Sequence, residues 1–163
     1  MSMIIDGTNG LTFNNATTQN SGGKVLQVIS VNYGVPNQPS TTSTTMVDTG
    51  ITATITPLFS NSKILIIPSI AGVSKTTTNT AASFQIVRNS TAIYYYENFI
   101  GYNAATTVNS GMSMTTYLDS PATTSATTYK IQWCQSGSGG TIYFNNTFSG
   151  NASSTITLME IAG

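Results

Sequence analysis

The sequence contains no histidine and only one cysteine, and these shortages exclude much of the usual catalytic chemistry. Histidine is the commonest general base and zinc ligand in proteins, and without it neither a Ser-His-Asp triad nor a Cys-His pair can be assembled. Cys134 has no second cysteine for an intrachain disulfide, which fits synthesis in a reducing cytoplasm. We interpret Cys134 as a small strand residue and not as a reactive thiol.

Carboxylates are the remaining candidates for acid–base catalysis, and there are five of them: Asp6, Asp48, Glu97, Asp119 and Glu160. Glycoside hydrolysis requires two carboxylates that face each other. Glu97 and Asp119 flank predicted strand ends and are the pair that could meet, but isolated acids at strand ends are the simpler interpretation. The sequence therefore predicts a protein that is not an enzyme, with no catalytic residue, no cofactor and no metal site.

Charged residues are scarce and balanced, at 6% of the chain with five basic and five acidic residues. Nucleic-acid binding needs several Lys or Arg side chains on one face, whereas these five lie far apart in the sequence. The longest apolar stretch, residues 64–73, is about half of the ~20 residues that a membrane-spanning helix needs, and residues 1–5 do not form a signal peptide. We expect neither a nucleic-acid partner nor membrane insertion, whereas near-zero net charge favours self-association.

Short strands dominate the rest of the sequence, because Thr-rich and apolar segments alternate with turn residues. The candidate strands are residues 24–33, 44–48, 51–56, 63–73, 83–89, 91–96, 112–118, 128–135, 141–144 and 154–161. This pattern predicts an all-β fold, namely an antiparallel β-sandwich that is jelly-roll-like, over residues 24–163. A short extended N-terminal arm, residues 1–23, precedes it. Strand order cannot be deduced from alternation alone.

Two of these strands carry information about burial. Tyr129, Ile131 and Trp133 fall on one face of the strand 128–135, so we expect Trp133 to be a core residue and not a ligand platform. The strand that begins at residue 63 is apolar on both faces from 64 to 67. This indicates either a central strand or a strand whose second face is covered by a neighbouring subunit.

Aromatic residues concentrate in one region, which contains Tyr94, Tyr95, Tyr96, Phe99 and Tyr102. Three interpretations remain open. Alternation would place Tyr94 and Tyr96 in the core and Tyr95 outside. The region could instead lie in a subunit interface, or form a platform for a glycan, because Tyr offers an apolar ring with a polar tip.

The arm contains two small apolar clusters separated by turn residues from Asp6 to Gly10. Its candidate assembly residues are Ile4, Ile5, Leu11 and Phe13. So short a segment cannot form a core of its own, because ordering each residue costs roughly 1–2 kcal/mol. We therefore expect these residues to be buried against another copy or another protein.

Several segments resemble accessory structural proteins of tailed bacteriophages. The stretch from Ile5 to Phe13, followed by Ala16 to Gln19, resembles the lead into the distal domains of phage fibres. Further segments resemble the opening and the last strand of the β-sandwich domain of that group: 23–28, 43–51, 62–66 and 154–161. The resemblance implies a virion structural protein, and such domains are typically homotrimers.

The implied role has a leading interpretation and three alternatives. A capsid decoration (cement) protein fits a compact chain, with the arm lying on the capsid shell and the sandwich projecting. A short tail or head fibre would instead bind the host surface, a lectin-like module would bind carbohydrate, and a spike enzyme would cleave glycans. The resemblance places the protein on the virion surface after synthesis in the host bacterial cytoplasm. Its partners would be itself, other virion proteins and a host surface glycan.

Overall fold

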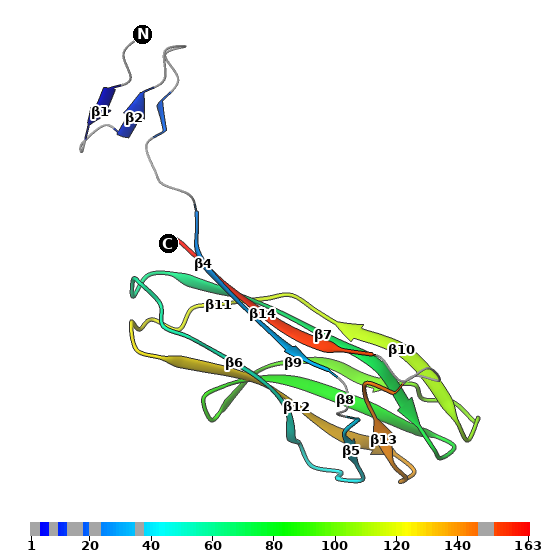
Figure 1. Cartoon of the computed structure of the whole chain (residues 1–163). Helices are drawn as coiled ribbons and strands as arrows, with labels where there is room; N and C mark the ends of the chain where they lie inside the picture. Colours follow the sequence, from blue (N-terminus) through cyan, green and yellow to red (C-terminus); the bar gives the residue numbers. More distant parts are fainter. Residues whose placement is uncertain (1–3, 7–9, 13–17, 20–23, 35–37, 147–151) are drawn as a thin grey trace.

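The computed structural model describes residues 4–6, 10–12, 18–19, 24–34, 38–146 and 152–163. Every regular element within these residues is a β-strand, and all pairings are antiparallel (Figure 1). The prediction of an all-β antiparallel sandwich is confirmed. The described residues contain no helix, and hence none that could span a membrane.

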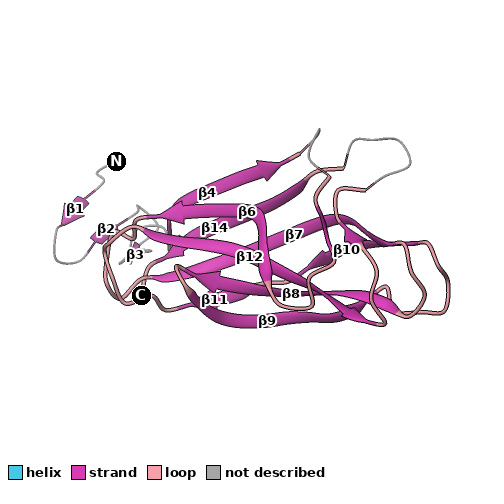
Figure 2. Ribbon diagram, turned by 90° about the horizontal axis from the view of Figure 1, so that it is seen from below, coloured by secondary structure: helices cyan, strands magenta, loops and turns pink. Residues whose placement is uncertain are grey.

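Two sheets face each other in the sandwich (Figures 1 and 2). The first sheet comprises β4 (Val25–Tyr33), β5 (Ser40–Thr41), β7 (Lys63–Lys75), β10 (Val108–Met114), β11 (Tyr117–Asp119), β13 (Ile142–Tyr143) and β14 (Ser154–Ile161). The second sheet comprises β6 (Val47–Ile55), β8 (Thr80–Arg88), β9 (Thr91–Ile100) and β12 (Thr127–Gly137). Strand β7 is central, since it pairs with β14 along one side and with β10 and β11 along the other.

The order of the strands is that of a jelly roll. With β10 and β11 counted as one interrupted strand, β4-β14-β7-β10/β11 faces β6-β12-β8-β9. If the two-residue strands β5 and β13 are set aside, the chain changes sheet at every connection except the β8–β9 hairpin. Eight principal strands wound in this way form the double-sheet jelly roll, an architecture that leaves few open sheet edges.

The core contains a continuous series of aromatic rings that crosses the sandwich. Its centre is Trp133, which is 1% exposed and lies 6.1 Å from the ring of Phe84 and 5.0 Å from that of Phe144. The remaining rings of the series are Tyr117, Tyr94 and Tyr96 on the Phe84 side and Tyr33 on the Phe144 side. Centroid distances of 4.6–6.4 Å lie in the range of attractive ring contacts. Trp133 is therefore a core residue, as alternation predicted.

The two ends of the sandwich differ (Figure 1). At one end, which we call the arm end, β4 begins and β14 finishes, and the Ala162 N–H donates to the Lys24 carbonyl at 2.7 Å. At the other, which we call the far end, the loops after β7, β9 and β12 are tied together. There the Asn79 carbonyl accepts from the Ser138 backbone N–H, and the Asn79 backbone N–H donates to the Asn103 carbonyl. The buried Lys75 ammonium donates to the same Asn103 carbonyl at 2.8 Å.

The N-terminal arm is folded into a small sheet of its own. Strands β1 (Ile4–Asp6), β2 (Gly10–Thr12) and β3 (Thr18–Gln19) pair in the order β1-β2-β3, and within the described residues they pair only with one another. The pairing of Asp6 with Gly10 confirms the expected chain reversal between them. Among the candidate arm residues, Ile5 lies opposite Leu11 and Ile4 opposite Thr12. Phe13 lies outside the described residues.

Two predicted strand boundaries are wrong for a local reason. The predicted strands 44–48 and 51–56 are one strand, β6, because Gly50 at a φ of +88° makes a bulge and does not end the strand. The predicted strand 112–118 is divided into β10 and β11 by residues 115 and 116. The two-residue strand β5 was not predicted, since Pro39-Ser40 has the composition of a turn.

Substitution of Trp133 by Ala should lower the free energy of unfolding by about 3–5 kcal/mol, because it removes the ring that links Phe84 to Phe144. Urea denaturation followed by far-ultraviolet circular dichroism measures the loss. The exposed Tyr95→Ala is the control and should change stability by less than about 1 kcal/mol. Wild-type tryptophan emission that is red-shifted and readily quenched by iodide would contradict this assignment.

Candidate interaction surfaces

The Tyr94–Tyr96 segment of β9 lies at the seam between the two sheets. Tyr96 packs against Phe84, and burial, reinforced by the charge of Glu97, raises the pKa of its hydroxyl. Tyr94 points to the same side but is 37% exposed, and its ring stacks on that of Tyr117 at 4.6 Å. Of the three open interpretations, a core position thus fits Tyr96, whereas Tyr94 is only partly covered. The physical reason is that β9 is the edge strand of its sheet, so the neighbouring position is only half covered.

Besides Tyr94, three of the candidate aromatic residues are exposed. Tyr95 lies on the outer side of the second sheet, where its hydroxyl donates to Asn98 Oδ1 at 3.2 Å. Phe99 and Tyr102, 46% and 52% exposed, form an edge-to-face pair with centroids 5.4 Å apart. Phe99 has a φ of +63°, which is unusual for a bulky residue, and the Tyr102 N–H closes this turn on the Phe99 carbonyl. We call Phe99 and Tyr102 the far-end aromatic pair.

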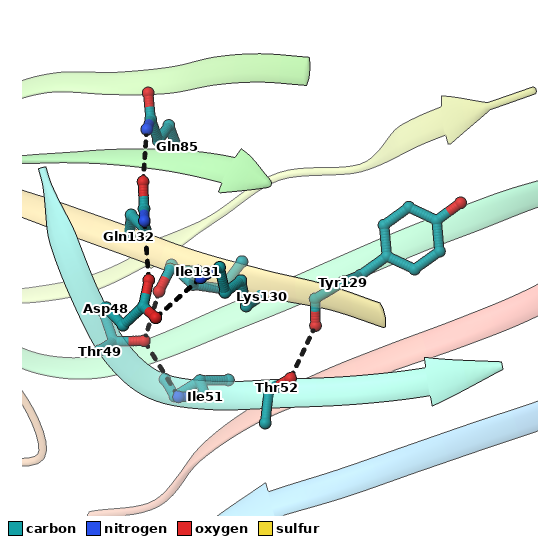
Figure 3. A network of polar contacts seen from close by, with 9 residues as sticks. All are labelled: Asp48, Thr49, Ile51, Thr52, Gln85, Tyr129, Lys130, Ile131 and Gln132. Carbon is teal, nitrogen blue, oxygen red and sulfur yellow. Dashed lines mark hydrogen bonds and ion pairs between the residues drawn. The ribbon is translucent and has the colours of Figure 1, made fainter. Parts of the chain in front are cut away.

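The outer face of the second sheet carries a ladder of polar side chains (Figure 3). Gln85 donates to Gln132 at 2.7 Å, and Gln132 donates to Asp48 Oδ1 at 2.7 Å. Lys130 completes the ladder, with its ammonium 2.8 Å from Asp48 Oδ2. The hydrogen bonds from Lys130 and then Gln132 hold the pKa of Asp48 below its ordinary value. Polar groups paired in this way form a surface suited to contact with water.

The outer face of the first sheet carries a row of apolar side chains in its arm-end half, whereas Ser30, Asn32, Thr155 and Thr157 occupy the outward positions of β4 and β14 nearer the far end. The strand register aligns Val28, Met159, Leu65 and Leu118 in one row across β4, β14, β7 and β11. Val28 and Leu118 are 52% and 50% exposed, while Met159 and Leu65 are half-buried. We call this row, together with its apolar neighbours, the apolar face. The neighbours are Val25, Ile67, Met112, Met114 and Ile161. Sequence analysis identified Leu65 within the two-faced apolar segment, but it missed the other residues of the row, because pairing between distant strands brings them together.

Glu97 and Asp119 do not face each other. Glu97 Oε2 lies 3.4 Å from the Ser113 hydroxyl, and Ser113 is paired with Ile70. Asp119 is paired with Ile64, six residues earlier in β7, which corresponds to roughly 20 Å along a strand. Glycosidase carboxylates lie within about 10 Å of each other, so this pair does not form such a site. Groups of three or more Asp, Glu, Cys or His side chains suited to a metal ion are absent from the described residues.

Asp119 has a structural role at the arm end. Both of its oxygens lie 2.9 Å from Arg88 Nη1, and Oδ2 also accepts a hydrogen bond from the buried Tyr129 hydroxyl at 2.7 Å. Burial, together with this hydrogen bond, raises the pKa of Tyr129. The pair joins β8 of the second sheet to β11 of the first.

Glu160 is a second buried carboxylate at the arm end. Its Oε1 accepts from the Leu58 N–H at 2.8 Å, and its Oε2 accepts from Gln27 Nε2 at 2.6 Å. Burial alone would raise the pKa of Glu160, but these hydrogen bonds to its charged form outweigh burial and hold the pKa below its ordinary value. The carboxylate therefore fastens the β6–β7 loop to β14 and β4.

Comparison with known proteins finds similarity at the level of fold. No family model and no curated protein matches the chain. A chain in the structure of infectious bursal disease virus, Gt strain, aligns with 94% of this chain and 42% of its own length, at 13% identity and a TM-score of 0.52. A chain of the Gx strain aligns with 94% and 40%, at 15% identity and a TM-score of 0.49. The chain thus spans less than half the length of these viral chains, and at this identity the likeness concerns the fold alone.

The Glu160 site predicts a defined pH dependence. Because its pKa is lower in the folded chain than in the unfolded chain, the stabilisation is present above the ordinary value of 4.5 and is lost as pH falls through the folded pKa. Glu160→Gln should lower the free energy of unfolding at pH 7 by about 1–3 kcal/mol, since the amide cannot accept all of these hydrogen bonds. Urea denaturation at a series of pH values from 7 to 3 measures both effects.

The control for this prediction is Asp48→Asn, which removes an exposed carboxylate with a lowered pKa. Exposed ion pairs contribute at most about 1 kcal/mol, so this variant should stay close to the wild type. A Glu160→Gln protein as stable as the wild type at pH 7, with an unchanged pH profile, would rule out this role for Glu160.

Proposed function

We propose that this chain is a non-enzymatic structural protein of a virus particle, displayed on its surface, where it decorates and stabilises the capsid. The observation that carries the proposal is the architecture. A jelly roll, similar in fold to a chain from a virus structure, is joined at one end to a separate small sheet (Figure 1). Carboxylates that a catalytic role would need are engaged in structural contacts instead.

In this proposal the arm attaches the protein to the capsid shell. Its strands have no hydrogen-bonded partner in the sandwich within the described residues, so they are available to another protein. Ile4, Ile5, Leu11 and Phe13 would provide the apolar contacts. The far end of the jelly roll would then project away from the shell, because the arm joins the opposite end.

The particle would be that of a tailed bacteriophage, and the protein would be a homotrimer. Both points rest on the resemblance of the segments 5–13, 23–28 and 154–161 to phage virion proteins. A free buried thiol at Cys134 is compatible with synthesis in a bacterial cytoplasm before assembly. Low net charge and exposed apolar side chains favour association between copies.

A specific observation favours a second candidate, a short fibre that binds a host surface glycan. The far-end aromatic pair exposes two rings at the end that would project, and exposed aromatic rings are common in binding surfaces. The turn at Phe99 also has a backbone conformation that bulky residues rarely adopt, and such strain gathers at functional positions. A free lectin-like module would use the same surface.

Deletion of residues 1–23 tests the attachment role. The truncated protein should keep a melting temperature within a few degrees of the full chain, because the arm strands pair only with one another among the described residues. It should no longer be incorporated into particles when it is supplied in place of the full chain. Sedimentation of particles, followed by quantitative mass spectrometry, measures incorporation. Truncated protein that still binds particles normally would overturn the proposed role of the arm.

Copy number and glycan binding separate the two candidates. A decoration protein should be present in hundreds of copies per particle, whereas a fibre should be present in a few to tens. On a glycan array, the decoration protein should show no binding that depends on Phe99 and Tyr102. Binding that is lost in Phe99→Ser and Tyr102→Ser variants with unchanged melting temperatures, together with a low copy number, would instead support the fibre.

A further inference from the structure

The row of apolar side chains across the first sheet continues on both sides. Toward the arm end lie Ile161 and Val25, which is 45% exposed. Toward the far end lie Ile67 and then two methionines, Met112 and Met114, which are 55% and 56% exposed. The apolar face therefore has members on all four principal strands of the sheet, and on β4 and β14 it ends at Ser30 and Thr157, whose hydroxyls hydrogen-bond to each other at 3.0 Å. The largest apolar patch on a soluble protein, typically a few hundred Å², often marks an interaction site.

Charge is almost absent from this face. In the described strands of the first sheet, Lys63 is the one charged side chain on the outer side, and its ammonium donates to Ser120 Oγ at 3.0 Å at the margin. The opposite face of the sandwich has the reverse character, since Asp48, Lys130 and two glutamines bond there in a closed ladder (Figure 3). One outer face of the sandwich is thus suited to water and the other to burial.

We propose that the apolar face is the surface on which copies of this chain meet. The inference rests on the self-association put forward above but not on its trimeric form, since two like faces packed on each other close as a two-fold pair. It does not depend on attachment to a particle. A face with so little charge offers no electrostatic complement to a nucleic acid, an anionic membrane or a charged protein patch. A second copy presents the same uncharged, pleated surface, and twisted sheets pack well face to face.

The area of the apolar face is close to that needed for an interface between two copies. Four strands ~4.8 Å apart and about seven residues of ~3.3 Å each give a flat footprint of roughly 450 Å² per copy, which includes the uncharged hydroxyl pair Ser30 and Thr157 beside the apolar side chains. Two such faces approach the ~1,000 Å² that a specific interface should exceed, and side-chain relief increases the accessible area further. Strand β4 adds an edge beside the face, and its nine residues include neither a charged residue nor proline to prevent pairing with another chain.

The Tyr94–Tyr102 region is the less suitable surface for this contact. Tyr94 is already stacked on Tyr117, and the Tyr95 hydroxyl is bonded to Asn98 beside the polar ladder. The far-end aromatic pair lies at the projecting end, away from the row. The apolar face thus accounts for the two-faced apolar pattern of residues 64–67, in which Leu65 and Ile67 face outward while Ile64 and Ile66 lie in the core.

Glutamate substitutions on the full-length protein test the proposal. Leu118→Glu and Met159→Glu place a charge on the row, whereas Thr52→Glu places the same charge on the exposed outer face of β6. Light scattering after size exclusion, from 1 to 100 micromolar, gives the mass. We expect the wild type and Thr52→Glu to be oligomeric. The two row variants should associate about 100-fold or more weakly, because a charge would be buried in the interface.

Circular dichroism and tryptophan emission confirm that the variants remain folded, and a row variant that unfolds is replaced by Val28→Glu, which lies at the sheet edge. Three results would overturn the inference. Row variants as oligomeric as the wild type would leave self-association standing but place it on another surface. A monomeric wild type would remove self-association altogether. A monomeric wild type whose particle binding is lost in the row variants would assign the face to another virion protein, leaving the attachment role intact.

Discussion

The fold depends on the contact between Trp133 and the rings on either side of it. Trp133 and Phe84 come from β12 and β8 of the second sheet, whereas Phe144 directly follows β13 of the first. Through these contacts and their extensions to Tyr117 and Tyr33, one aromatic series reaches from the β11 edge to the β4 edge. The two sheets are therefore held by a few large rings, and Ile side chains such as Ile66 and Ile131 fill the space around them. Ring contacts of this kind add to the burial of apolar area, which is the main stabilising contribution.

Most of the buried charged side chains make contacts that hold the fold together. Asp119 pairs with Arg88 across the sandwich, Glu160 anchors a loop, and Lys75 is buried beneath the far-end loops. Burial lowers the pKa of Lys75, and its ammonium donates to a backbone carbonyl. The polar surface is therefore built mostly from uncharged Thr, Ser, Asn and Gln side chains. A surface of this composition offers little long-range electrostatic repulsion between copies.

The sequence was sufficient for those features that depend on alternation within a strand. The core position of Trp133 and the sandwich class follow from a period of two residues, and the two-faced segment 64–67 follows from the local absence of that period. It was insufficient where the answer depends on which strands are neighbours. Val28 and Leu118 are far apart in the sequence and share a row only through β14 and β7. The interpretations of Tyr94 stayed open for the same reason, since alternation gives the face of a strand but not whether the strand lies at a sheet edge.

The position of the two chain ends has a practical consequence for display. Gly163 lies at the arm end, where the Ala162 N–H bonds to the Lys24 carbonyl. A peptide fused after Gly163 would therefore emerge beside the N-terminal arm, and if the arm attaches the protein to a shell as proposed, the shell would crowd it. The β9–β10 loop at residues 103–106 lies at the opposite end, with exposed side chains. A cargo inserted there would stand at the outer tip of the jelly roll, at the greatest distance from the arm that the fold allows.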